Sequence, residues 1–135
     1  MIVCEDFVSL IKIFPDFVQI PLKSYVMNST LTEIVFDIGK CPEARFTSGV
    51  VILSPRIICK QDMNYALTRI TAFNDKNRAG ISKTLHRISC LKNREDQIIG
   101  LTCRVGRSII GLTNKIRDLL PQNKSILILG KPGSG

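Results

Sequence analysis

The sequence is organised around its final eleven residues, which read Ser125-Ile-Leu-Ile-Leu-Gly130-Lys-Pro-Gly-Ser-Gly135. Four consecutive aliphatic residues at 126–129 predict a short strand buried on both faces, as in a parallel sheet. The six residues Gly130, Lys131, Pro132, Gly133, Ser134 and Gly135 then match the first six positions of GxxxxGK[ST], a loop whose backbone N–H groups converge on phosphate. The pattern continues with a lysine for the β- and γ-phosphates and a Ser or Thr for Mg²⁺, which this sequence does not contain. We therefore expect the chain to be the N-terminal part of a longer nucleotide-binding protein.

Composition predicts one globular domain and favours an anionic partner. The chain has 135 residues, of which 44% are hydrophobic and 22% are charged, which is ordinary for a folded domain. It carries 19 Lys and Arg against 11 Asp and Glu, a formal net charge of +8. Such a charge favours nucleic acid, nucleotide or an acidic membrane surface, but a solvated basic surface accounts for it equally well.

The cysteines and the N-terminal residues exclude several protein classes. The five cysteines form no CxxC pair, which predicts free thiols in a reducing compartment. We expect no zinc or other metal site, because the cysteines are scattered and His86 is the only histidine. Residues 1–22 are apolar, but charged side chains interrupt them, so we expect neither a secretory signal nor a transmembrane segment.

The hydrophobic pattern predicts an α+β arrangement over residues 1–120. Apolar spacing predicts short helices over 5–14 and 16–26, with Pro21 as a potential kink. Alternation predicts a sheet meander over 31–53, split near Ser48-Gly49. A helix is expected over 62–73 with Asp62 as its cap. A polar loop at 74–80, strands at 84–91 and 98–107 around a turn at 92–97, and a helix at 108–120 closed by Pro121 complete the pattern.

These elements divide the chain into two parts. Residues 1–120 are expected to form an α+β N-terminal domain with a small sheet meander, a helix, a hairpin and a helix. Residues 121–124 are expected to be a linker. Residues 125–135 are expected to supply the first strand and the incomplete phosphate loop of an α/β domain.

Basic residues in the second half are candidates for contact with phosphate. They are Arg78, Arg87, Arg94, Arg104 and Arg107, with His86 among them. One interpretation is that they meet a triphosphate in the adjacent domain or a neighbouring subunit, and a second is that they hold a nucleic-acid backbone. The alternative is that each arginine is solvated or paired with a local acid. His86 is interpreted as a hydrogen-bonded structural residue, and the scarcity of aromatic side chains argues against a base-stacking surface.

Several longer stretches of the sequence resemble one known family. They are Asp75 to Ile81, Thr84 to Ser89, Asn93-Arg94, Ile99 to Arg107, Phe14 to Phe17, Leu31 to Gly39 and Pro42 to Phe46. The family that they resemble is the plastid-encoded P-loop ATPases of algae and their cyanobacterial counterparts. These are similar to the stage III sporulation protein AA ATPases and more remotely to secretion-type ATPases.

The resemblance implies a plastid protein in which a RecA-like or AAA-type ATPase domain follows the α+β domain. It implies that residues 130–135 are the nucleotide loop, that the intact protein uses ATP and Mg²⁺, and that it is a homo-oligomer in the plastid stroma. Arg104 and Arg107 become candidates to act across a subunit interface. We expect residues 1–120 to be regulatory or partner-binding, and the 135 residues alone neither to hydrolyse ATP nor to bind it tightly. The alternative is a non-catalytic basic module associated with single-stranded nucleic acid.

Overall fold

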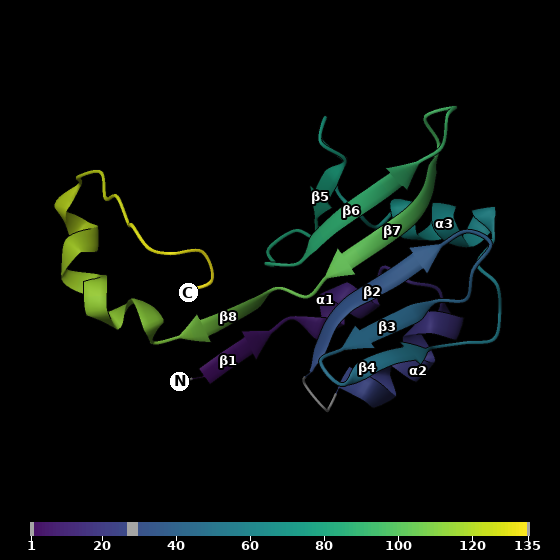
Figure 1. Ribbon diagram of the computed structural model, residues 1–135, viewed down its shortest axis with the longest axis horizontal. Coiled ribbons are helices and arrows are strands. Elements are labelled where there is room, and N and C mark those ends of the chain that lie inside the picture. Colours follow the sequence, from purple (N-terminus) through teal and green to yellow (C-terminus); the bar gives the residue numbers. More distant parts are fainter. Residues whose placement is uncertain (1, 27–29, 135) are drawn as a thin grey trace.

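A computed structural model describes residues 2–26 and 30–134, and its centre is a six-stranded antiparallel sheet (Figure 1). The strand order is β4-β3-β2-β7-β6-β5. The strands are β2 (Leu31–Asp37), β3 (Glu43–Phe46), β4 (Gly49–Ile52), β5 (Arg78–Gly80), β6 (Arg87–Lys92) and β7 (Ile98–Arg104). The central pair β2 and β7 joins the two halves of the chain, because Glu33 to Asp37 lie opposite Arg104 to Gly100.

Three helices cover one face of this sheet and form the core with it (Figure 1). They are α1 (Phe7–Ile11), α2 (Asp16–Val26) and α3 (Lys60–Leu67). Alternate strand residues such as Phe36 and Leu101 point into this layer and are at most 1% exposed. The phenyl rings of Phe36 and Phe14 have centroids 5.3 Å apart, so β2 is fixed directly to the segment between α1 and α2. We call the opposite, helix-free side the outer face.

A second, two-stranded sheet leads the chain away from this body (Figure 1). It pairs β1 (Ile2–Glu5) with β8 (Arg107–Ile110) in antiparallel register, and we call it the ribbon. The 3₁₀ helix η1 (Leu112–Gln122) follows the ribbon and contains no buried residue. No helix among residues 2–26 and 30–134 is long and apolar enough to cross a membrane.

The structure confirms most of the predicted elements of the body. Both N-terminal helices form, and α2 accommodates Pro21. The meander divides after Phe46, as expected, and Ile34 and Phe36 point into the core. Strands also form within both predicted hairpin segments, and Arg78 to Gly80 add a short edge strand in the segment that we expected to be a loop.

Two predicted helices differ from the structure. The helix predicted over 62–73 is α3, which begins at Lys60 and ends at Leu67, so the prediction is wrong for 68–73. Asp62 lies in the first turn of α3 rather than at its cap. Its carboxylate instead accepts the backbone N–H of the N-cap residue Cys59 at 2.9 Å. The helix predicted over 108–120 is wrong at its start, because residues 107–110 pair with β1. The remainder is the exposed 3₁₀ helix, since helices owe most of their stability to packing and no described segment covers this one.

The strand predicted over 126–129 is not formed in this structure. Leu127, Ile128 and Leu129 are between 76% and 84% exposed. A strand buried on both faces needs strands on either side and covering layers above and below. No described segment pairs with these residues, so the physical condition for that strand is not met within the part of the chain that the structure describes.

Burial separates Cys90 and Cys103 from the exposed Cys59, with Cys41 intermediate. Burial raises the pKa of the Cys90 thiol and raises that of Cys103 further, whereas Cys59 is exposed. A raised pKa lowers the thiolate fraction at a given pH, and the thiolate is the nucleophile. With an alkylating reagent near neutral pH, we expect Cys59 to react first and Cys90 and Cys103 to react only after unfolding, as peptide mass spectrometry would show. Equal rates at Cys59 and Cys103 would contradict this burial pattern.

Candidate functional site

Three arginines from neighbouring strands gather on the outer face. Arg87 in β6 lies directly opposite Arg104 in β7, and Arg78 in β5 lies opposite Ser89 in β6. These residues alternate with the buried Ile88 and Cys103, so their side chains point away from the helices. The sheet therefore brings three guanidinium groups to one surface, although 26 residues separate Arg78 from Arg104 in sequence.

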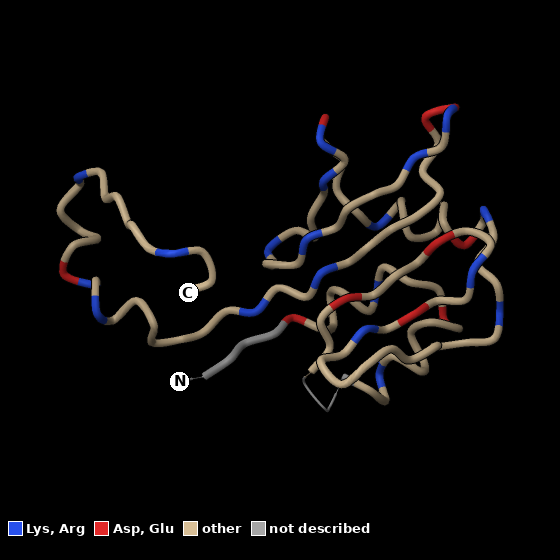
Figure 2. Tube along the Cα trace, in the orientation of Figure 1, with Lys and Arg blue, Asp and Glu red and all other residues tan. Residues whose placement is uncertain are grey.

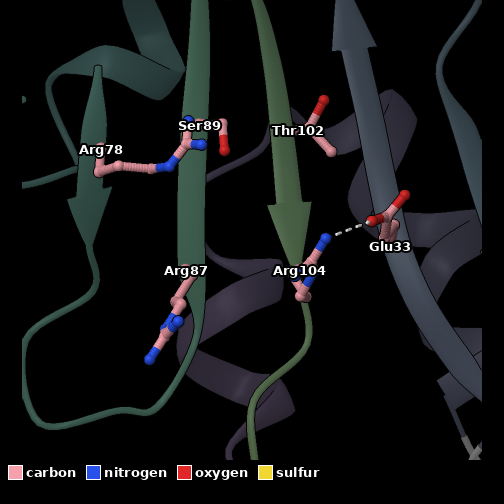
Figure 3. Close-up of a pocket in the computed structure, with 6 residues that line it drawn as sticks. All are labelled: Glu33, Arg78, Arg87, Ser89, Thr102 and Arg104. Carbon is pink, nitrogen blue, oxygen red and sulfur yellow. Dashed lines mark hydrogen bonds and ion pairs between the residues drawn. The ribbon is translucent and has the colours of Figure 1, made fainter. Parts of the chain in front are cut away.

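These arginines line a cavity of about 210 Å³, which we call the arginine cleft (Figure 3). Its lining residues are Glu33, Arg78, Arg87, Ser89, Thr102 and Arg104. Arg78 lies across β6 beside Ser89, and Arg104 is directed at Glu33 (Figure 3). Arg78 and Arg87 also line a second cavity of about 370 Å³, together with Asn74 and Ala79.

The positive charge of the arginine cleft is only partly neutralised. Glu33 accepts from Arg104 at 3.5 Å and from Arg45 at 3.5 Å, and it is the only acidic residue lining the cleft. No described acidic side chain forms an ion pair with Arg78 or Arg87. Like charges directly opposite each other on paired strands destabilise a sheet. The repulsion between Arg87 and Arg104 therefore destabilises the β6–β7 pair, and a bound anion would remove that repulsion. Figure 2 shows basic residues along β5, β6 and β7, acidic residues along β2, and both kinds along β3.

The other predicted basic residues lie elsewhere. Arg94 lies in the exposed turn between β6 and β7. The guanidinium of Arg107 donates to the backbone carbonyl of Leu31, so it joins the start of β8 to the start of β2. The structure thus brings Arg104 together with Arg78 and Arg87, and it gives Arg107 a structural contact at the base of the ribbon.

His86 is a buried structural residue, as interpreted from the sequence. It is 3% exposed, and its Nδ1 accepts the backbone N–H of Gly106 at 3.0 Å. Its Nε2 lies 2.6 Å from the carbonyl oxygen of Asp6. Because an acceptor at Nδ1 leaves Nε2 to carry the proton, the ring is the neutral Nε2–H tautomer and donates to Asp6. His86 therefore connects the two backbone segments that lead to and from the ribbon.

Asp6 also begins helix α1 at this position. Its carboxylate accepts the backbone N–H of Ser9 at 3.1 Å and the Ser9 hydroxyl at 3.0 Å. Both hydrogen bonds lower the pKa of the Asp6 carboxyl below its usual value, and the bond from the Ser9 backbone N–H has the larger effect. The backbone carbonyl of Asp6 thus accepts a hydrogen bond from His86, while the Asp6 side chain caps α1.

The glycine-rich stretch forms a tight turn within its described residues. Ser134 donates its N–H to the Lys131 carbonyl at 3.2 Å and its hydroxyl to the same oxygen at 2.7 Å. Gly133 has φ of +80°, a conformation that favours glycine. The residue types follow the phosphate-loop pattern, but the Ser134 N–H is bonded to the Lys131 carbonyl and would have to leave it to face a phosphate. Gly135 lies outside the described residues.

Sequence reasoning missed Glu33, Ser89 and Thr102 as parts of the cleft. Ser89 and Thr102 occupy alternate positions to buried residues, which is a signal that could have placed them on the outer face. Glu33 lies more than 50 residues before them, and only the β2–β7 register places it opposite Arg104. Among the residues that the structure describes, no group of three or more His, Cys, Asp or Glu side chains is arranged to hold a metal ion.

Curated proteins similar to this chain include plastid proteins of algae and a plant. The chain is 51% identical over 135 residues to "Uncharacterized protein ycf45" of Porphyra purpurea, covering all of the chain and 24% of that protein. It is 42% identical over 127 residues to "Protein SEEDLING PLASTID DEVELOPMENT 1" of Arabidopsis thaliana, covering 94% of the chain and 19% of that protein. It is also 42% identical over 135 residues to "Uncharacterized protein ycf45" of Cyanidium caldarium, covering all of the chain and 40% of that protein.

The chain thus spans less than half of the length of each of these relatives. The relatives indicate a plastid location for the chain. No family model matches the sequence, and no solved structure matches it.

Proposed function

We propose that this chain is the N-terminal α+β part of a plastid protein that binds and hydrolyses ATP, and that its nucleotide loop begins at Gly130. The main observation in support of the proposal is that the aliphatic run at 126–129 is followed directly by the glycine pattern at 130–135. An aliphatic strand followed by such a loop is the arrangement that places backbone N–H groups around phosphate.

The exposure of the aliphatic run supports this proposal. Leu127, Ile128 and Leu129 leave most of their side-chain surface in water, and burying each would contribute about 1.5–3 kcal/mol. These residues therefore favour a further sheet that would surround them, and the relatives have enough additional length for such a domain. In that setting, Lys131 to Ser134 would open and turn their N–H groups toward the β-phosphate.

The catalytic lysine and the Mg²⁺-binding hydroxyl of the pattern are not among these 135 residues. Because phosphoryl transfer depends on positioning and electrostatics, hydrolysis is expected only in a protein that supplies both groups. The bound nucleotide would provide the phosphoanhydride, and this chain would contribute backbone donors and the α+β domain beside them.

The test is nucleotide binding by the full-length gene product with Gly133→Asp as the key variant. A carboxylate at Gly133 would repel the phosphates, so we expect affinity for a fluorescent ATP analogue to fall more than about tenfold. Gly39→Asp is the matched control, since Gly39 has φ of +83° and open space around it, as Gly133 does. Absence of ATP binding by the unmodified protein, or equal affinity in both variants, would reject the proposal.

A further inference from the structure

We infer that the outer face of β5, β6 and β7 is a binding site for the phosphodiester backbone of single-stranded nucleic acid, centred on Arg78, Arg87 and Arg104. This site is separate from the glycine-rich stretch, and it does not depend on the proposed ATPase activity. Three guanidinium groups and the hydroxyls of Ser89 and Thr102 line one open cleft, and all five side chains can donate to phosphate oxygens.

The distribution of charge along the chain supports an extended anion rather than a single phosphate. Residues 76–107 contain eight Lys or Arg and two acidic residues, a net charge of +6. Residues 1–75 contain seven basic and eight acidic residues, a net charge of −1. The positive charge is thus concentrated in the segment that builds β5, β6 and β7, as Figure 2 shows, and it continues beyond the cleft.

The dimensions of the sheet also fit a polyanion. Neighbouring strands lie about 4.8 Å apart, so the three strands that carry the arginines span about 10 Å. That width corresponds to about three nucleotides at the 3.4 Å charge spacing of a stacked strand. None of the residues that line the cleft is aromatic, so recognition would use phosphates and would be tolerant of base sequence.

Glu33 limits how tightly the site would bind an anion. Its carboxylate holds Arg104 at 3.5 Å and Arg45 at 3.5 Å, and a phosphate in the cleft would compete with it for Arg104. Arg104 is 71% exposed in its side chain, so it can exchange partners without leaving a buried charge unpaired. A neutral residue at position 33 would therefore strengthen the binding of the anion.

The test is fluorescence anisotropy of labelled single-stranded RNA and DNA, each of about 12 nucleotides, with the 135-residue chain. Three phosphate contacts predict a slope of about −2 for log affinity against log salt concentration, an affinity loss of about 20-fold between about 50 mM and 200 mM salt. The double variant R78Q/R87Q leaves one contact, so its loss over the same range should be about threefold. E33Q should bind more tightly than the unmodified chain.

The matched control is K12Q/K23Q, which removes two charges from the helix-covered side at exposed positions of the same fold. Circular dichroism would establish that all variants fold. Stronger binding of RNA or of DNA would identify the source of the phosphodiester, and either supports the inference. Four results would overturn it: no binding at low salt, equal weakening in both double variants, tighter binding of poly-glutamate, or full competition by inorganic tripolyphosphate at equal phosphate concentration.

Discussion

Replacing Phe36 with alanine is expected to lower the free energy of unfolding by about 3–5 kcal/mol. Phe36 lies in the central strand β2, is fully buried, and its ring contacts that of Phe14 with centroids 5.3 Å apart. Truncation removes the apolar contacts of a phenyl ring and leaves a cavity between the sheet and the helices. Because single domains of this size are stable by about 5–15 kcal/mol, the variant should be close to unfolding.

Urea unfolding followed by far-ultraviolet circular dichroism measures this effect, since the chain has no tryptophan. Tyr25→Ala is the matched control, because Tyr25 also pairs with a phenylalanine, Phe46 at 5.8 Å, but is 37% exposed. It should cost about 1 kcal/mol. Equal losses in the two variants would mean that the Phe14–Phe36 contact is not the centre of the core.

Local periodicity was sufficient to predict five of the six strands of the body, and it missed the short edge strand β5. Residues 31–38 and 98–107 alternate between apolar and polar side chains, and a two-residue repeat has one physical explanation, a sheet with one buried face. The alternation places Ile34 and Phe36 on one face of their strand and Leu101 and Cys103 on one face of theirs, and the structure buries all four. Such signals depend only on near neighbours in the chain and can be read from one sequence.

Pairing between distant segments could not be predicted in the same way. Residues 108–110 fit a helical repeat, but they pair with Ile2 to Cys4, more than 100 residues earlier. The decisive interaction there is a set of backbone hydrogen bonds that leaves no sequence signal at the spacing of a helix. The aliphatic run at 126–129 is the opposite case, in which a strong local signal has no described partner to complete it.

The same contrast between local signals and distant pairing applies to the candidate site. The sequence identified the basic residues, because charge and residue type are visible directly. It could not select Arg78, Arg87 and Arg104 from the wider set, since that selection depends on the strand order β5-β6-β7 and on the register that places Arg87 opposite Arg104. Glu33 lines the cleft for the same reason, through the pairing of β2 with β7.

Replacing His86 with phenylalanine is expected to lower the free energy of unfolding by about 3 kcal/mol, although an aromatic ring remains. The native ring accepts from Gly106 at 3.0 Å and donates to Asp6 at 2.6 Å, and phenylalanine can do neither. A buried polar group left without its partner costs about 1–3 kcal/mol, and the substitution removes two part-buried hydrogen bonds made by the buried His86 ring. The Gly106 N–H and the Asp6 carbonyl would both lose the connection to β6 that His86 provides.

The same variant should loosen the ribbon more than the body. His86 joins the residue that follows β1 to the segment that follows β7. Gly106 packs so closely against Leu85 that a Cβ at that position would overlap the Leu85 backbone. We therefore expect faster amide hydrogen exchange in β1 and β8 of His86→Phe, with β2 and β7 protected until global unfolding. His86→Gln retains one donor and one acceptor and should recover part of the stability and the protection. A His86→Phe protein as stable as the native chain would show that the ring only fills space, and that Arg107 and the β1–β8 hydrogen bonds alone hold the ribbon in place.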